Sequence, residues 1–111
     1  MNEIQQSAWD FLLDRFAGIE NAAPRATVLA RYNLVHKKDI SDRDSRETVS
    51  ILVSIYKKAI CTHPARGYFV ARTVAEKNEA INYLDSVLTE VGARRRALAG
   101  ANPLERQERM F

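Results

Sequence analysis

Apolar residues recur at helical spacing near the start of the chain. Over residues 4–17 the apolar stripe covers more than half of the helical circumference and leaves a narrow polar strip. A stripe of this width is typical of a helix that contacts two neighbours, or one neighbour and a partner chain. Gly18 follows this segment and is suited to ending a helix.

The pattern predicts two further helices over residues 24–56, joined as a helix-turn-helix. Pro24 suits the first turn of a helix, which ends either at Asn33 or as late as Lys37. Either Ser41 or Asp42 can cap the next helix. Its apolar residues follow the i, i+3, i+4, i+7 spacing of a buried stripe: Val49, Leu52, Val53 and Tyr56. The opposite face is polar.

Residues 59–71 have the pattern of a β-hairpin, with His63 to Gly67 as the turn between aromatic and β-branched residues. Thr73 and Glu76 form a capping box that opens a long closing helix, expected over residues 73–99. Part of its apolar face keeps heptad spacing for two turns, which permits packing on another helix within or between chains. That face comprises Ala80, Ile81, Leu84, Val87, Leu88, Val91 and Leu98.

The order of these elements predicts the fold class, which is mainly α with a small β-hairpin (α+β). Three helices, a hairpin and a long C-terminal helix correspond to a winged helix-turn-helix, in which the hairpin is the wing. A length of 111 residues fits one domain, expected over residues 1–99. Residues 100–111 contain an Asn-Pro break signal, so we expect a mobile tail.

Composition excludes several classes of function. One cysteine, Cys61, leaves no intrachain disulfide or cysteine-based metal site, and two histidines are too few for a metal cluster. Glycine-rich phosphate loops, paired carboxylates in apolar context and nucleophile motifs are absent, so we expect neither an enzyme nor a cofactor. No apolar run is long enough for a membrane span and the N-terminus lacks a signal-peptide pattern, which makes the cytoplasm the expected compartment.

The net charge of +3 is unevenly distributed along the chain. Residues 1–24 carry one basic and four acidic side chains, which gives −3, and residues 25–72 carry ten basic and four acidic ones, which gives +6. A concentrated positive segment attracts polyanions, most often nucleic acid. A solvated, arginine-rich surface accounts for the same charge equally well.

The candidate DNA contacts lie on the third helix and around it. Arg43 and Arg46 can reach phosphates or guanine edges, and Ser50 and Ser54 can hydrogen-bond phosphates. Further basic candidates are Lys37 and Lys38 before this helix, Lys57 and Lys58 at the base of the wing, and Arg66 at its tip. Arg43 can instead pair with Glu47 one turn away, as on an ordinary solvated helix.

Three segments resemble a group of small phage and prophage winged-helix proteins. They are ISDRDSRETVSIL, AICTHPARGYFVA and a capped helix that ends in RRRAL, and the resemblance covers about residues 24–99. It implies a protein that binds double-stranded DNA in phage replication or in the regulation of transcription.

The end of the chain resembles a second known pattern. Gln107, two variable residues, Met110 and Phe111 are similar to the peptide by which bacterial replication proteins bind the sliding clamp. This resemblance implies docking on a host protein. The apolar tail residues can also fold back on the protein or mediate a dimer contact.

An alternative interpretation is a protein-interaction module, such as a phage-encoded adaptor or inhibitor of a host protein. The wide apolar stripe of the first helix, the outward position of Ile51 and the Met-Phe tail favour it. Exposed positions on the first and last helices also leave room for a homodimer.

Overall fold

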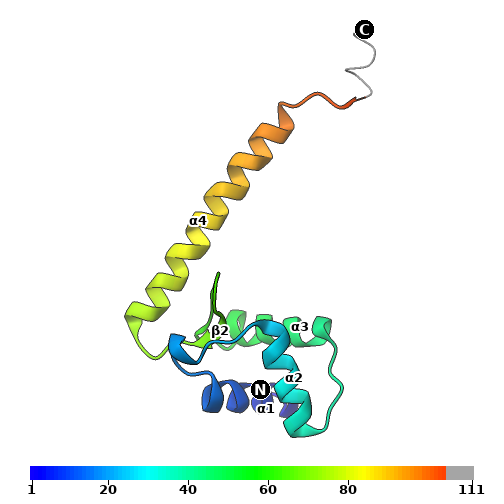
Figure 1. Cartoon of the computed structure of the whole chain (residues 1–111), viewed down its shortest axis with the longest axis vertical. Coiled ribbons are helices and arrows are strands. Elements are labelled where there is room, and N and C mark those ends of the chain that lie inside the picture. The colour runs from blue at the N-terminus through cyan, green and yellow to red at the C-terminus, as the bar shows by residue number, and fades with distance from the viewer. Residues whose placement is uncertain (105–111) are drawn as a thin grey trace. The chain divides into compact units, whose positions relative to one another are not determined.

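The computed structural model describes residues 1–104 and is mainly helical with one antiparallel hairpin, which confirms the predicted fold class (Figure 1). Within these residues the helices are α1 (Glu3–Arg15), α2 (Arg25–His36), α3 (Asp42–Ser54) and α4 (Val74–Ala99). The strands are β1 (Ile60–His63) and β2 (Gly67–Val70), and a 3₁₀ turn, η1, spans Ile19–Asn21. This helix-plus-hairpin order is compatible with a winged helix.

The chain divides into two compact units. The N-terminal unit, Met1–Ala80, contains α1, α2, α3, the hairpin and the beginning of α4, and the C-terminal unit begins at Ile81. Among residues 1–104, no helix combines the length and the apolar character that crossing a membrane requires.

The segment after α1 pairs with the hairpin, a feature that the sequence pattern does not reveal. Gly18 N–H donates to the Val70 carbonyl at 2.8 Å, and Val70 N–H donates to the Phe16 carbonyl at 2.8 Å. Further along, Ala23 and Tyr68 exchange backbone hydrogen bonds of 3.1 and 2.8 Å. Strand β2 is therefore hydrogen-bonded along both edges, which anchors the hairpin to the helices. This pairing also explains why α1 ends at Arg15 rather than at residue 17.

The Asn33 side chain fixes the conformation of the connection between α2 and α3. Helix α2 continues to His36, and Lys37 takes the left-handed conformation at its end with φ of 52°. Asn33 therefore does not end the helix. Instead, its amide donates to the Ile40 carbonyl and its oxygen accepts from Ile40 N–H, both at 3.1 Å. These two hydrogen bonds fix the chain just before Ser41, whose hydroxyl caps α3.

The core lies where α1, α2 and β2 meet. Its buried members include Phe11 from α1, Phe16 just after that helix, Tyr32 from α2 and Val70 from β2. The rings of Phe11 and Tyr32 meet edge to face with their centroids 5.3 Å apart, a favourable aromatic geometry.

Helix α3 buries a different face from the one that its apolar spacing predicts. Leu52 is fully buried, but Val53 and Tyr56 are 39% and 37% exposed. The small side chains of Ser45 and Thr48 are half-buried instead and line a space between α3 and the two preceding helices. Small residues let α3 approach these helices closely, so the inward face is rotated toward them and the predicted positions of Val53 and Tyr56 are wrong.

The beginning of α4 is tied to the segment after α1. Glu76 N–H donates to the Thr73 hydroxyl at 3.1 Å, which is one of the two hydrogen bonds of the predicted capping box; the reciprocal bond from Thr73 N–H to Glu76 does not form among the residues that the structure describes. The Glu76 carboxylate accepts from Ile19 N–H at 2.8 Å and from Arg72 N–H at 3.3 Å. The Glu76 carboxylate thus links the beginning of α4 to the segment after α1, which lies more than fifty residues earlier in the sequence.

Replacing Glu76 with alanine is expected to lower the free energy of unfolding by about 2 kcal/mol, because two backbone N–H groups lose a charged acceptor. Urea unfolding followed by the fluorescence of Trp9, the one tryptophan, measures this change. Glu79→Ala is the matched control, since Glu79 is exposed on the same helix. It should change stability by less than about 0.5 kcal/mol. Equal effects of the two substitutions would refute the anchoring role.

Candidate nucleic-acid interface

One face of α3 is polar and open to solvent. Arg43, Glu47, Ser50 and Ser54 are all exposed, as their spacing predicts. The Ser41 hydroxyl accepts from Asp44 N–H at 3.2 Å at the start of the helix. The rotation of α3 that exposes Val53 and Tyr56 therefore leaves this polar face accessible.

The two arginines of this helix differ in their surroundings. Arg46 Nε lies 3.2 Å from Asp42 Oδ2, so a carboxylate one turn away holds its guanidinium. Arg43 takes part in no ion pair within residues 1–104, and the alternative Arg43–Glu47 pair does not form there. Arg43 is thus the side chain of α3 that is best placed to meet an external anion.

Asp42 also joins α3 to α2. Its carboxylate accepts from Arg25 Nε at 2.9 Å and from Arg25 Nη2 at 3.3 Å. The Tyr68 side chain, and after it Asp42, raise the pKa of Arg25 despite the opposing effect of partial burial. The sequence alone does not reveal this pair, because the two residues lie on different helices and only the fold brings them together.

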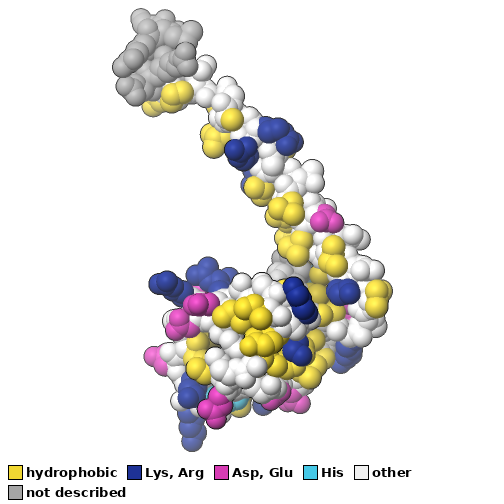
Figure 2. Space-filling model, turned by 180° about the vertical axis from the view of Figure 1, so that it is seen from behind, with side chains coloured by type: hydrophobic (Ala, Val, Ile, Leu, Met, Phe, Trp, Pro, Cys, Tyr) yellow, Lys and Arg dark blue, Asp and Glu magenta, His cyan; other side chains and the backbone are white. Residues whose placement is uncertain are grey.

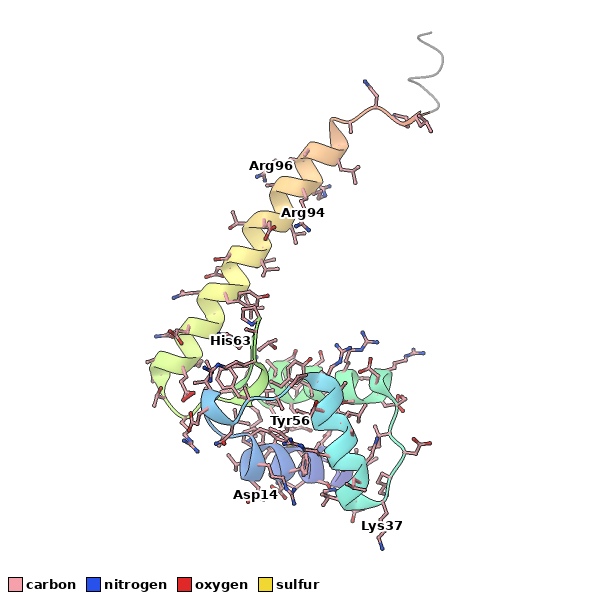
Figure 3. The ribbon with its side chains drawn as sticks, in the orientation of Figure 1. Asp14, Lys37, Tyr56, His63, Arg94 and Arg96 are labelled. Carbon is pink, nitrogen blue, oxygen red and sulfur yellow. The ribbon has the colours of Figure 1, made fainter. Side chains whose placement is uncertain are left out.

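The four candidate lysines fall into two groups. Lys37, Lys38 and Lys57 are exposed, and Figure 3 shows Lys37 pointing away from the ribbon after α2. Lys58 is half-buried, with its ammonium 5.0 Å from the centroid of the Trp9 ring. This cation–π contact directs Lys58 toward α1 and makes it less available to a ligand than the other three.

A histidine holds the turn of the hairpin. His63 Nδ1 accepts from the backbone N–H groups of Ala65 and Arg66, both at 3.1 Å. Both partners are donors, so this nitrogen carries no proton in the structure. His63 therefore acts as a turn residue, as the sequence favours, and it holds the turn that presents the exposed Arg66 at its tip.

Acidic side chains interrupt this basic surface. Asp42, Asp44 and Glu47 lie on the same helix as Arg43 and Arg46. Arg25 and Arg46 partly neutralise Asp42, whereas Asp44 and Glu47 take part in none of the ion pairs of the described chain. The resulting face has mixed charge, which favours selective contacts over adhesion to any polyanion.

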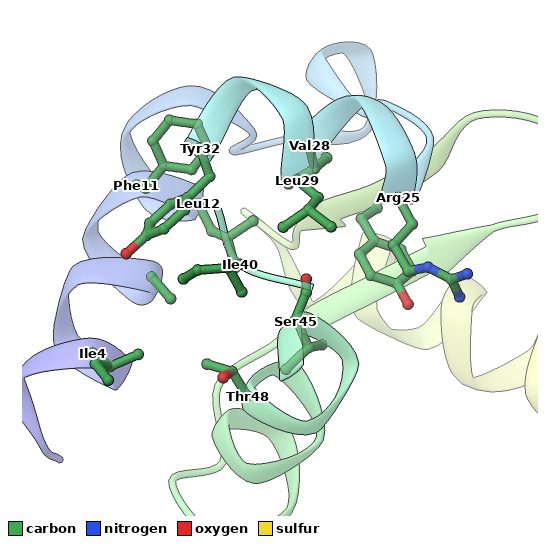
Figure 4. Close-up of a pocket in the computed structure, with 13 residues that line it drawn as sticks. Ile4, Phe11, Leu12, Arg25, Val28, Leu29, Tyr32, Ile40, Ser45 and Thr48 are labelled. Carbon is green, nitrogen blue, oxygen red and sulfur yellow. The ribbon is translucent and has the colours of Figure 1, made fainter. Parts of the chain in front are cut away.

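A small cavity of about 50 Å³ lies between α1, α2 and α3 (Figure 4). Apolar side chains such as Leu12, Leu29 and Ile40 line it, with Ser45 and Thr48 on the side of α3. Ligand pockets are usually about 300–1,000 Å³ in volume. The cavity is therefore a feature of core packing rather than a ligand site.

Two kinds of side chain were candidates for site chemistry in the described residues: metal ligands and the one cysteine. Within residues 1–104 no three His, Cys, Asp or Glu side chains gather in a metal-ligating group. Cys61 is buried, and desolvation raises the pKa of its thiol although a backbone hydrogen bond from Ala71 opposes the shift. A protonated, enclosed thiol is a poor nucleophile.

The structure thus places Arg43, Ser50 and Ser54 on one exposed helix face, and Arg66 at the tip of the hairpin. Arg46 and Lys58 instead have partners within the N-terminal unit. The predicted clamp-binding residues Gln107, Met110 and Phe111 lie outside the described residues. Comparison of the chain with models of protein families, with curated proteins and with solved structures gives no match.

Proposed function

We propose that the protein binds double-stranded DNA, with the exposed face of α3 in the major groove and the hairpin as a wing against the backbone. The observation that carries the proposal is Arg43, an exposed arginine on a polar helix face that has no ion-pair partner among residues 1–104. The hairpin that follows α3 adds a second cation, Arg66. The resemblance of residues 24–99 to phage proteins supports a role in phage replication or in the regulation of transcription, in the cytoplasm.

Such binding depends strongly on salt. Five exposed cations are available for phosphates: Lys37, Lys38, Arg43, Lys57 and Arg66. If each neutralises one phosphate, affinity falls by about 500-fold between 50 and 200 mM salt. Asp44 and Glu47 oppose this attraction, so we expect micromolar binding to DNA of random sequence at the lower salt.

Fluorescence anisotropy of a random-sequence duplex at two salt concentrations tests the proposal. Arg43→Ala is expected to weaken binding about tenfold, because a free guanidinium contact is lost. Arg46→Ala should weaken it less, since Asp42 holds Arg46. Arg94→Ala is the matched control: Arg94 is also exposed but lies on α4, where it pairs with Glu90 at 2.9 Å. It should change the affinity by less than twofold.

Two results would contradict this docking geometry. Equal losses from Arg43→Ala and Arg94→Ala would show that charge alone, rather than the face of α3, determines binding. The absence of binding at the lower salt would show that the basic segment is only a solvated surface.

A protein-interaction module remains the second candidate, and one groove favours it. Val35 of α2 and the α1 residues Asp10 and Asp14 line this groove, and Leu34 beside Val35 is 80% exposed. An apolar edge next to carboxylates suits a partner segment with both basic and apolar side chains. A host protein such as the sliding clamp would be the partner to test first if DNA does not bind.

A further inference from the structure

An apolar stripe runs along α4 in the C-terminal unit. Ile81, Leu84, Leu88 and Val91 alternate three and four residues apart, Arg95 occupies the next position, and Leu98 continues the series. These five apolar side chains are between 46% and 76% exposed. Figure 2 shows hydrophobic side chains along the length of this helix. Heptad spacing of this kind is the pattern by which helices pack against each other.

The charges of α4 are divided between its two halves. Residues 74–86 carry three acidic side chains and one lysine, which gives −2, and residues 87–99 carry three arginines and one glutamate, which gives +2. This division suits the dipole of the helix itself. It also makes the helix complementary to a second copy that runs in the opposite direction, whereas a parallel copy would align like charges.

The apolar area is sufficient for a weak dimer. Burying one aliphatic side chain removes roughly 100 Å² from water, so five that are half to three-quarters exposed supply roughly 300 Å². The flanking side chains add to this area, but the total stays below the roughly 800 Å² per partner of a standard interface. We therefore expect association in the micromolar range rather than an obligate dimer.

We propose that α4 pairs with the α4 of a second copy of the chain in antiparallel orientation, with Leu84 of each copy against Leu88 of the other. In this register Ile81 faces Val91. Arg95 falls opposite Lys77 of the partner helix, where the adjacent Glu76 supplies the opposite charge. The long aliphatic part of Arg95 can cover the stripe while its guanidinium reaches solvent. This inference does not depend on DNA binding.

Sedimentation velocity over a dilution series of the full chain tests the proposal. The wild-type protein should change from monomer to dimer with rising concentration, and Leu88→Asp should weaken association at least tenfold. Ser86→Asp is the matched control, because Ser86 is exposed on the opposite side of the same helix and gains the same charge. It should associate like the wild type. A wild-type protein that stays monomeric up to several hundred micromolar, or a Leu88→Asp variant that still associates normally, would overturn the proposal.

Cysteine cross-linking tests the orientation. In a Cys61→Ala background, Leu84→Cys and Leu88→Cys variants are oxidised separately and as a mixture. An antiparallel pair predicts disulfide-linked dimers only in the mixture, since position 84 faces position 88. Cross-linking within each variant alone would reveal a parallel pair and refute the antiparallel arrangement.

Discussion

Alanine in place of Gly67 should lower the free energy of unfolding of the N-terminal unit by about 4 kcal/mol. Gly67 has φ of +97°, where a side chain costs about 1–2 kcal/mol. Its added Cβ would also lie 2.2 Å from the Ala23 carbonyl oxygen and 2.6 Å from Pro24 N. These are backbone atoms held by the Ala23–Tyr68 hydrogen bonds, so they cannot move aside cheaply. Overpacking of this kind adds about 1–3 kcal/mol.

Urea unfolding followed by Trp9 fluorescence measures this loss. Gly92→Ala is the matched control, because the Cβ added there would meet only Arg96 Nη1 at an ordinary 3.6 Å. Inside a helix alanine is favoured over glycine by about 1 kcal/mol, but Gly92 lies in the C-terminal unit, so this change should leave the urea midpoint reported by Trp9 unchanged. A Gly67→Ala protein that unfolds at the wild-type urea concentration would show that β2 does not approach Ala23 as closely as described.

The regular elements could be predicted because their signals are local. The Thr73 cap of α4 and the turn between His63 and Gly67 each use residues that are neighbours in sequence. The pairing of the segment after α1 with the free edge of β2 could not be predicted in this way. Residues 16–23 contain a 3₁₀ turn and no alternation of apolar and polar residues, so their pairing with β2 depends on contacts some fifty residues away.

In the candidate site, too, local features could be predicted from the sequence, whereas contacts between elements could not. The spacing of Arg43, Glu47, Ser50 and Ser54 predicts a shared exposed face, and the structure has it. The spacing does not reveal that Asp42 holds Arg46 together with Arg25, or that Trp9 attracts Lys58. Such partners come from other helices, so a basic residue in the sequence indicates charge but not its availability.

Leu52→Ala should lower the free energy of unfolding by about 3 kcal/mol. Leu52 is fully buried and lies on the side of α3 that faces the rest of the N-terminal unit. Removing a buried leucine side chain leaves a cavity, and such changes cost about 2–5 kcal/mol. The same unfolding measurement by Trp9 fluorescence applies.

Val53→Ala, the neighbouring substitution, tests which face of α3 is buried. The structure exposes Val53, whereas the apolar spacing of the helix predicts that Val53 is buried. Val53 is 39% exposed, so its truncation should cost less than about 1 kcal/mol. If both substitutions cost about 3 kcal/mol, then Val53 is buried and α3 is rotated toward the predicted stripe. That rotation would carry Arg43 and Ser50 with it, because all these residues share one rigid helix. The comparison of two aliphatic side chains therefore also tests which side chains of α3 are exposed for the proposed contact with DNA.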